Sequence, residues 1–456
     1  MSALKRLETE KIPKLLMEFS IPAIVGSLVF ALYNIVDRMF IGKGLGAYAM
    51  TGLSITFPIF TLYIAIGMLI GQGGGSLVSL RLGEGKKDEA NKTLGNTVTL
   101  FTVFSILLMI LGRIFLDDLL FLFGATENTL IYAKNYMSII NLLVFFDFMA
   151  MGMNNLMRAE GSSKLAMKYM VTGAIINVIL DPILIFGFDM GIKGAAIATA
   201  FSNIVVTIAV FYHFIYSKNS NIKLKKENLI LDPRTVKGIF KIGISPFVLQ
   251  VTTSLIAVAC NKTLLMYGGD MAVGAMGIVN SIYMFMAMTI SGIRAGSQPI
   301  IGYNYGAGRF DRVVETLKIS LIGSMFIAGF ITLIAFFKGE FLINLFNDGN
   351  IEILRIGEKG LKIFLSMAVL NAFYMIGANY FQAINQAIKS IILNLTRQVV
   401  LFVPLFIILP KYYGIDGIWL IWPISDIIIS LFTGYFLKKN IKELKIKQEK
   451  EVILTI

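Results

Sequence analysis

Residues 15–40, LLMEFSIPAIVGSLVFALYNIVDRMF, decide the class of this chain. The stretch exceeds the roughly 20 apolar residues that a helix needs to cross a hydrocarbon core of about 30 Å. Similar stretches recur along almost the whole sequence of 456 residues, of which 56% are hydrophobic and 15% are charged. Charged residues make up about 25% of a typical soluble domain. We therefore expect an all-α polytopic membrane protein with no room for a soluble domain.

Twelve membrane spans are expected from the apolar runs between polar breaks. They cover residues 15–40, 51–75, 94–113, 130–155, 165–188, 193–216, 239–264, 273–297, 316–337, 359–384, 390–410 and 416–437. The first span lacks the small-residue cleavage site of a signal peptide and should be retained. With Met1 in the cytoplasm, roughly 30 of the 41 Lys and Arg residues fall on the cytoplasmic side. This bias predicts a multi-pass protein of the cell membrane with both termini cytoplasmic, and it accounts for the net charge of +13 without nucleic acid as a partner.

The two halves of the sequence match each other at a nearly constant offset. Pro22 matches Pro246 and Asp37 matches Asn261 (246 − 22 = 261 − 37 = 224), while 83–88 match 306–311 and 202–203 match 425–426 (306 − 83 = 425 − 202 = 223). Because each repeat holds an even number of spans, we expect two six-helix lobes related by an internal repeat. The expected divisions are an N-terminal lobe at 1–216, a cytoplasmic basic linker at 217–238, a C-terminal lobe at 239–440 and a cytoplasmic tail at 441–456.

Asp37 is the first candidate functional residue, because it lies inside the first apolar span. A carboxylate at the centre of a membrane helix costs about 2.5–3.5 kcal/mol on insertion scales, and it usually lines a pathway or is protonated. We interpret Asp37 as part of a transport pathway. The alternative is a position near the outer interface, where Arg38 or Lys43 would pair with it by snorkelling.

Asn177 and Asp181 are four residues apart in the fifth span and therefore share one helix face. Pro182 frees a backbone carbonyl near residue 178, so an unwound turn beside the two side chains could coordinate a cation or hold a proton. The alternative is a kink in which both side chains only satisfy the freed backbone. Thr199 and Asn203, again four apart, could face the same cavity from the sixth span or serve only as contacts between helices.

The composition disfavours an enzyme and several kinds of site. The single cysteine, Cys260, excludes an intramolecular disulfide and a cysteine cage for a metal, and the single histidine, His213, excludes a histidine cluster. Residues 71–76, GQGGGS, lack the GK[ST] ending of a phosphate loop and more plausibly allow close helix packing. No catalytic residue and no cofactor are expected, and a membrane-embedded transferase would need paired acids or histidines that are not evident.

Four motifs together resemble those of the multidrug and toxic compound extrusion (MATE) transporters, and within them the MepA-like branch. They are Asn34-Ile35-Val36-Asp37 with Ile41-Gly42, Leu82-Gly83-Glu84-Gly85, Met157-Arg158-Ala159-Glu160-Gly161, and Asn177 to Pro182. The resemblance covers nearly the whole chain. It implies twelve helices in two lobes and export of amphiphilic, often cationic compounds in exchange for Na⁺ or H⁺.

The resemblance also implies a coupling site for H⁺ or Na⁺, formed by Asp37, Asn177, Asp181 and Thr199. Further candidate contacts to the cavity or the substrate are Tyr33, Asn34, Asn154, Asn203, Asn261 and Asp426. The chain departs from the branch with an acidic residue in helix seven, which puts a Na⁺ site in the C-terminal lobe in doubt. We expect alternating access, a functional monomer, and small amphiphilic molecules and the lipid bilayer as partners. The alternative is a flippase for a lipid-linked precursor, which should have a strongly basic cavity, whereas these spans are poor in Lys and Arg.

Overall fold

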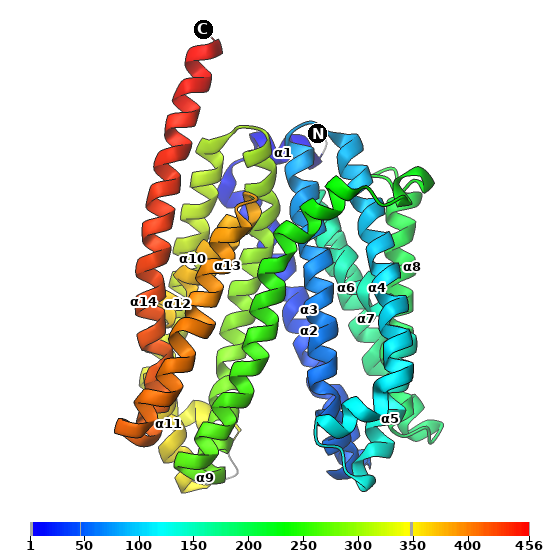
Figure 1. Cartoon of the computed structure of the whole chain (residues 1–456), viewed down its shortest axis with the longest axis vertical. Coiled ribbons are helices and arrows are strands. Elements are labelled where there is room, and N and C mark those ends of the chain that lie inside the picture. Colours follow the sequence, from blue (N-terminus) through cyan, green and yellow to red (C-terminus); the bar gives the residue numbers. More distant parts are fainter. Residues whose placement is uncertain (1–2, 46, 347–349, 456) are drawn as a thin grey trace. The chain divides into compact units, whose positions relative to one another are not determined.

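The structure, a computed structural model, describes residues 3–45, 47–346 and 350–455. The first half of the chain forms α1 (Ala3–Thr9), α2 (Ile12–Leu45), α3 (Ala47–Gly83), α4 (Lys87–Leu122), α5 (Glu127–Leu142), α6 (Val144–Ala159), α7 (Ser163–Pro182), the π-helix η1 (Ile183–Gly187), α8 (Ile192–Ile215) and the 3₁₀ helix η2 (Lys226–Leu229). The second half forms α9 (Pro233–Gly306), α10 (Phe310–Asn344), α11 (Ile351–Leu365), α12 (Ala368–Ala383), α13 (Ala387–Leu395), the π-helix η3 (Thr396–Leu401) and α14 (Phe402–Thr455), as Figure 1 shows.

The expected number of membrane spans agrees with the helices of the described residues. Eight helices are long and apolar enough to cross a membrane, or up to 10 if the bent pairs α5–α6 and α11–α12 each count as one span. The bends are 61° and 49°. In α9 and α14, Gly269 and Gly414 have non-helical dihedrals and join two helices each. Dividing α9 and α14 at these glycines gives twelve segments in the part of the chain that the structure describes.

The backbone repeats the internal match of the sequence. Gly85 and Gly308, which are equivalent under the repeat (308 − 85 = 223), have φ values of 73° and 71° at the turn before the third helix of each repeat. Gly191 and Gly414, equivalent at the same offset (414 − 191 = 223), have φ, ψ of 55°, −136° and 58°, −134°. Glycine is the residue that adopts such left-handed conformations without strain. The two repeats therefore share their turn geometry as well as their sequence pattern.

The helices pack into two compact units, and each half of the chain contributes one short segment to the unit formed mainly by the other half. The first unit contains Met1–Thr9 and Val25–Phe247, and the second contains Glu10–Ile24 and Val248–Ile456. The exchange occurs at equivalent places, because the two breaks differ by the offset of the repeat (247 − 24 = 223). This contact-based grouping follows packing rather than chain order, so it differs from the division at 216 and 239 that the repeat suggests.

Small residues allow the exchanged segments to pack backbone to backbone. In the first unit, a Cβ at Gly243 would lie 1.7 Å from the Leu69 carbonyl oxygen, and one at Gly73 would lie 2.3 Å from the Ile239 carbonyl oxygen. In the second unit, a Cβ at Gly296 would lie 2.6 Å from the Ser20 nitrogen. The glycine-rich segment 71–76 is thus a helix-packing element, as the sequence predicts.

Residues 217–238, the expected linker, lie against the first unit. Asn96 of α4 donates through Nδ2 to the Asn228 and Ile230 carbonyls (3.1 and 3.0 Å) and accepts from the Asp232 amide at 2.7 Å. The carboxylate of Glu160, which is fully buried, accepts from Ser220 Oγ at 2.8 Å and from the Ile222 amide at 3.1 Å, and it contacts the His213 ring. Hydrogen bonds therefore hold the segment against the first unit, so it is not a free linker.

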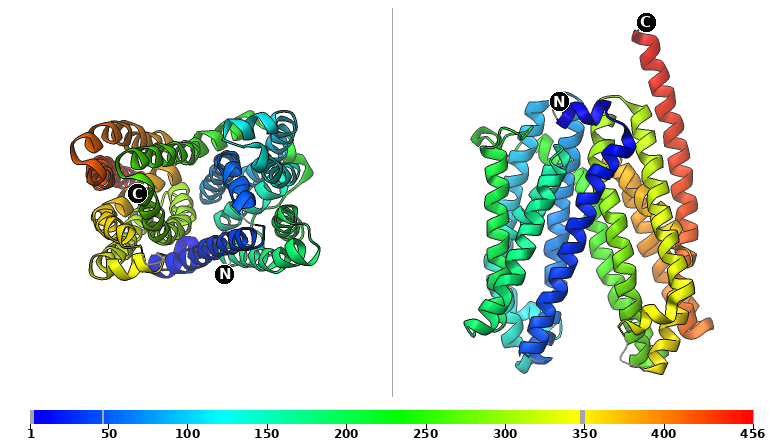
Figure 2. Two further views of the ribbon diagram at one scale, coloured as in Figure 1. Left: turned by 90° about the horizontal axis from the view of Figure 1, so that it is seen from below. Right: turned by 180° about the vertical axis from the view of Figure 1, so that it is seen from behind.

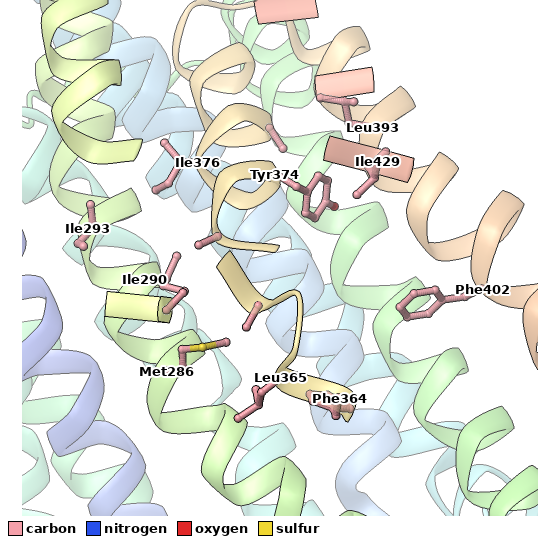
Figure 3. Close-up of a cluster of buried hydrophobic side chains, with 14 of the residues drawn as sticks. Met286, Ile290, Ile293, Phe364, Leu365, Tyr374, Ile376, Leu393, Phe402 and Ile429 are labelled. Carbon is pink, nitrogen blue, oxygen red and sulfur yellow. The ribbon is translucent and has the colours of Figure 1, made fainter. Parts of the chain in front are cut away.

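Each unit is held together by helices that run side by side (Figure 2). Figure 3 shows a buried apolar cluster in the second unit, to which Met286 and Ile290 of α9, Phe364 of α11, and Tyr374 of α12 contribute. The C-terminal part of α14 extends beyond the other helices of this unit (Figure 1).

Candidate functional site

The amide of Asn177 is the centre of a polar group between α7 and α8. Asn177 and Asp181 have 1% and 0% exposure, on one face of α7, and Thr199 lies opposite on α8. With the amide oriented to satisfy its neighbours, its nitrogen donates to Asp181 Oδ2 at 3.2 Å, and its oxygen accepts from Thr199 Oγ1 at 3.2 Å. The structure therefore brings these three predicted residues together.

Asp37 of α2 completes this group. It is 6% exposed, and its carboxylate interacts electrostatically with that of Asp181. Tyr136 of α5 is buried within electrostatic range of both carboxylates, and the half-buried Tyr33 lies in the same region. The side chains of Asn34, Arg38 and Lys43 lie outside the described residues.

The backbone beside Asp181 is regular up to Pro182. Helix α7 continues through Pro182, and the irregular part is the π-helix at Ile183–Gly187 rather than an unwound turn near residue 178. Asp181 Oδ1 has no hydrogen-bond partner among the described residues. Asp181 Oδ1 is therefore an acceptor that can still bind a proton or a cation.

The chemistry of the four residues suits a small hard cation or a proton. Asp37 and Asp181 provide carboxylate oxygens, Asn177 an amide oxygen and Thr199 a hydroxyl oxygen. Oxygen ligands of this kind bind hard cations. Two carboxylates that interact electrostatically can also share one proton, and their titration would then belong to the pair.

A third acid, Asp147, lies in the first unit and was not predicted. It is at the start of α6, three residues beyond Val144, and its Oδ1 accepts from Asn203 Nδ2 of α8 at 2.5 Å. Tyr63 of α3 and Tyr136 of α5 lie within its electrostatic range. Asn203 is therefore bound to Asp147, rather than to the cluster around Asn177.

In the second unit, Asp426 forms a buried ion pair. Arg397 of the π-helix η3 donates through Nε to Asp426 Oδ1 at 2.9 Å, and Asn371 of α12 donates to the same oxygen at 3.0 Å. The guanidinium also lies 4.7 Å from the ring centre of Phe402 and 5.4 Å from that of Tyr374. Asp426 thus has a cationic partner supplied by its own lobe.

The other candidate contacts have different surroundings. Asn154 is buried; its amide donates to the Ala166 carbonyl at 2.9 Å and accepts from Arg158. Asn261, equivalent to Asp37 in the repeat, is exposed on α9.

The sequence could have signalled some of the missed residues. Asp147 is equivalent to Asn371 in the sequence repeat (371 − 147 = 224), and two polar residues at equivalent positions within apolar spans indicate a candidate site. The partnership of Glu160 with His213 and the linker depends on packing between distant segments, and no local pattern indicates it.

Comparisons with known proteins agree with this architecture. The MatE family model matches the chain twice, over residues 22–183 and 246–408, and the two matches start at equivalent points of the repeat (246 − 22 = 224). Multidrug export protein MepA of Staphylococcus aureus (strain MRSA252) is 30% identical over 425 residues, covering 91% of this chain and 90% of that protein. MepA of Staphylococcus haemolyticus (strain JCSC1435) is 27% identical over 441 residues, covering 95% and 96%.

Solved structures show the same fold. The MATE multidrug transporter DinF-BH in complex with R6G superimposes with a TM-score of 0.88 at 35% identity, covering 94% of this chain and 96% of that one. A multidrug resistance MATE family transporter in an outward-facing conformation gives a TM-score of 0.91 at 23% identity, covering 96% and 98%.

The two matches to the MatE model and the relatives named multidrug export proteins define a multi-pass membrane transporter rather than an enzyme. The chain belongs to the MATE family.

Proposed function

We propose that this protein exports amphiphilic, often cationic compounds in exchange for H⁺ or Na⁺, by alternating access. The proposal places the coupling cation at Asp37, Asn177, Asp181 and Thr199. One observation supports it above the others: two interacting carboxylates are buried in the membrane helices of one unit, beside an amide and a hydroxyl that offer oxygen ligands.

The substrate class rests on the relatives. Two of them are named multidrug export proteins, and DinF-BH was solved with R6G bound. The MepA sequence and the DinF-BH structure align with this chain over 91% and 94% of its length. We therefore propose the same class of substrate, with the monomer as the transporting unit and both termini on the cytoplasmic side of the cell membrane.

The energy available from the membrane potential fits this site. Moving one positive charge inward yields about 2.3 kcal/mol per 100 mV, which is comparable to the cost of about 2.5–3.5 kcal/mol for one intramembrane carboxylate. A cation shifts the equilibrium between inward-open and outward-open states only by its difference in affinity for them. Loading and release at the carboxylate pair provide such a difference.

Uptake of a fluorescent cation such as ethidium into inverted proteoliposomes tests the proposal. A pH gradient and a Na⁺ gradient are imposed separately, with protein-free liposomes as the control. We expect uptake above the control in at least one of the two arms, and the active arm identifies the coupling ion. Equal uptake with and without either gradient would contradict antiport.

A further inference from the structure

The two units contain the same aspartate–asparagine contact with its two partners exchanged. In the first unit, Asn203 of α8 donates to Asp147 of α6, and in the second, Asn371 of α12 donates to Asp426 of α14. The positions correspond under the repeat, because Asp147 matches Asn371 (371 − 147 = 224) and Asn203 matches Asp426 (426 − 203 = 223). Each contact thus joins equivalent helices. The carboxylate, however, is on α6 in the first unit and on α14, the counterpart of α8, in the second.

The bend in each repeat places these residues alike. The bend residues Leu143 and Met367 have φ, ψ of −108°, 12° and −112°, 21°. Asp147 and Asn371 each follow their bend by four residues (147 − 143; 371 − 367). The aspartate–asparagine pair is therefore a structural feature that both units share.

The two carboxylates differ in how their charge is balanced. Asp426 is neutralised by Arg397, whose Nε lies 2.9 Å away. The residues of α7 equivalent to Arg397, at offsets from 224 to 222, are Gly173, Ala174 and Ile175, none of which carries a charge. Among the described residues, no lysine, arginine or histidine forms an ion pair with Asp147.

Within the described residues, the groups that face Asp147 from neighbouring helices do not provide a cation either. They are Tyr63 of α3, Tyr136 of α5 and Asn203 of α8, and Tyr136 is also within range of the acids Asp37 and Asp181. An unpaired charge at this depth is unfavourable unless it is neutralised. Asp147 is only partly buried, unlike Asp181.

We propose that Asp147, with Asn203, is a second exchangeable-cation site of the first unit. It takes H⁺ or a monovalent cation from solution, whereas the carboxylate of the corresponding contact in the second unit, Asp426, is paired with the fixed cation of Arg397. This inference rests on the proposed antiport function and adds a site to it, separate from Asp37 and Asp181.

The test counts the cations that purified protein in detergent releases when ethidium binds. One arm follows H⁺ release in weak buffer with a pH dye, and the other follows displacement of radioactive Na⁺ at fixed pH. We expect Asp147→Asn to release about one cation fewer per bound ethidium in one arm, because a carboxylate holds one proton or ion. The double variant Asp37→Asn/Asp181→Asn should still release the cation that Asp147 holds.

Two variants serve as controls. Asp117→Asn removes an exposed acid of α4 and should release as many cations as the wild type. The exchange Asp147→Asn/Asn203→Asp copies the arrangement of the second unit and should restore the release. If Asp147→Asn does not fold, the test uses the exchange variant Asp147→Asn/Asn203→Asp instead. Release of as many cations as the wild type from this folded variant supports the site, and release of fewer cations contradicts it.

Wild-type release from folded Asp147→Asn in both arms would overturn this inference while leaving the proposed function intact. Failure of the proposed function is a different result, namely no release from the wild type in either arm and no gradient-driven uptake.

Discussion

At the scale of single residues, Asn177 organises the candidate coupling site. Its amide is placed between a carboxylate on its own helix and a hydroxyl on α8, so it fixes the distance between α7 and α8 at this depth. Bound cations would replace or bridge these contacts. The second unit has an ion pair at Asp426 where the first has Asp147 without a described cationic partner, which suggests unequal roles for the two units.

Thr199→Val removes the hydroxyl beside the Asn177 amide and keeps the side-chain volume. The hydroxyl is proposed as an oxygen ligand and also orients the Asn177 amide, so its loss, at about 1.4 kcal/mol, should lower the affinity for the coupling cation roughly 10-fold. The measurement is the cation concentration that gives half-maximal dye export in vesicles. Thr199→Ser keeps the hydroxyl and is the matched control, and equal values for the two variants would argue against a role in binding.

Asp426→Asn should destabilise the second unit, because it leaves the buried guanidinium of Arg397 without its counter-charge. Breaking a buried ion pair from one side costs about 3–5 kcal/mol, whereas removing both charges costs much less. Thermal unfolding in detergent should therefore show a lower midpoint for Asp426→Asn than for Asp426→Asn/Arg397→Met. The opposite order would mean that Asp426 is not neutralised by Arg397 in the membrane protein.

At the scale of helices, irregular segments lie beside the polar groups of both units. The π-helix η1 directly follows Asp181 and Pro182, and the π-helix η3 contains Arg397. Such segments are rare in regular helices and frequent at functional sites. The bends between α5 and α6 and between α11 and α12 likewise precede the aspartate–asparagine contacts by one turn.

Gly243→Ala tests the backbone packing of α9 against α3 within the first unit. The new Cβ would lie 1.7 Å from the Leu69 carbonyl oxygen, so the helices must separate. We expect the free energy of unfolding to fall by at least about 3 kcal/mol, which is the upper end of the usual cost of overpacking a core. Gly323→Ala in α10 meets nothing within 4 Å and should be neutral or slightly stabilising. The fraction of monodisperse protein and its unfolding temperature in detergent would report both effects, and equal behaviour of the two variants would refute this packing.

At the scale of the whole molecule, the sequence predicts the helical repeat well because hydrophobic length and turn glycines are local signals. It also predicts that Asn177 and Asp181 share a helix face, because they are four residues apart, whereas only the resemblance to MATE transporters indicated that Thr199 joins them. The exchange of segment Glu10–Ile24 between units could not be predicted, since it depends on which backbones meet. Asp147 has no polar residue one turn away on its own helix, so only its match with Asn371 in the repeat would have indicated it.

Labelling with a membrane-impermeant maleimide tests the orientation that the cationic bias predicts. Cys260→Ser removes the only cysteine, and single cysteines then replace Phe188, between α7 and α8, or Lys226 in the linker. We expect Phe188→Cys to react in intact cells and Lys226→Cys to react only after permeabilisation. Reaction of both in intact cells, or the reverse pattern, would exclude cytoplasmic termini in the twelve-helix arrangement.

Gradient-driven efflux of a fluorescent cation in vesicles, normalised to inserted protein, is the most direct test of coupling in the first unit. Asp37→Asn and Asp181→Asn are nearly isosteric and remove only the ability to change charge. Each should insert normally and abolish most transport, whereas Asn261→Ala and Asp426→Asn, normalised in the same way, should retain more. Wild-type rates in both Asp37→Asn and Asp181→Asn, or a complete loss confined to Asp426→Asn, would contradict the account and assign coupling to the second unit.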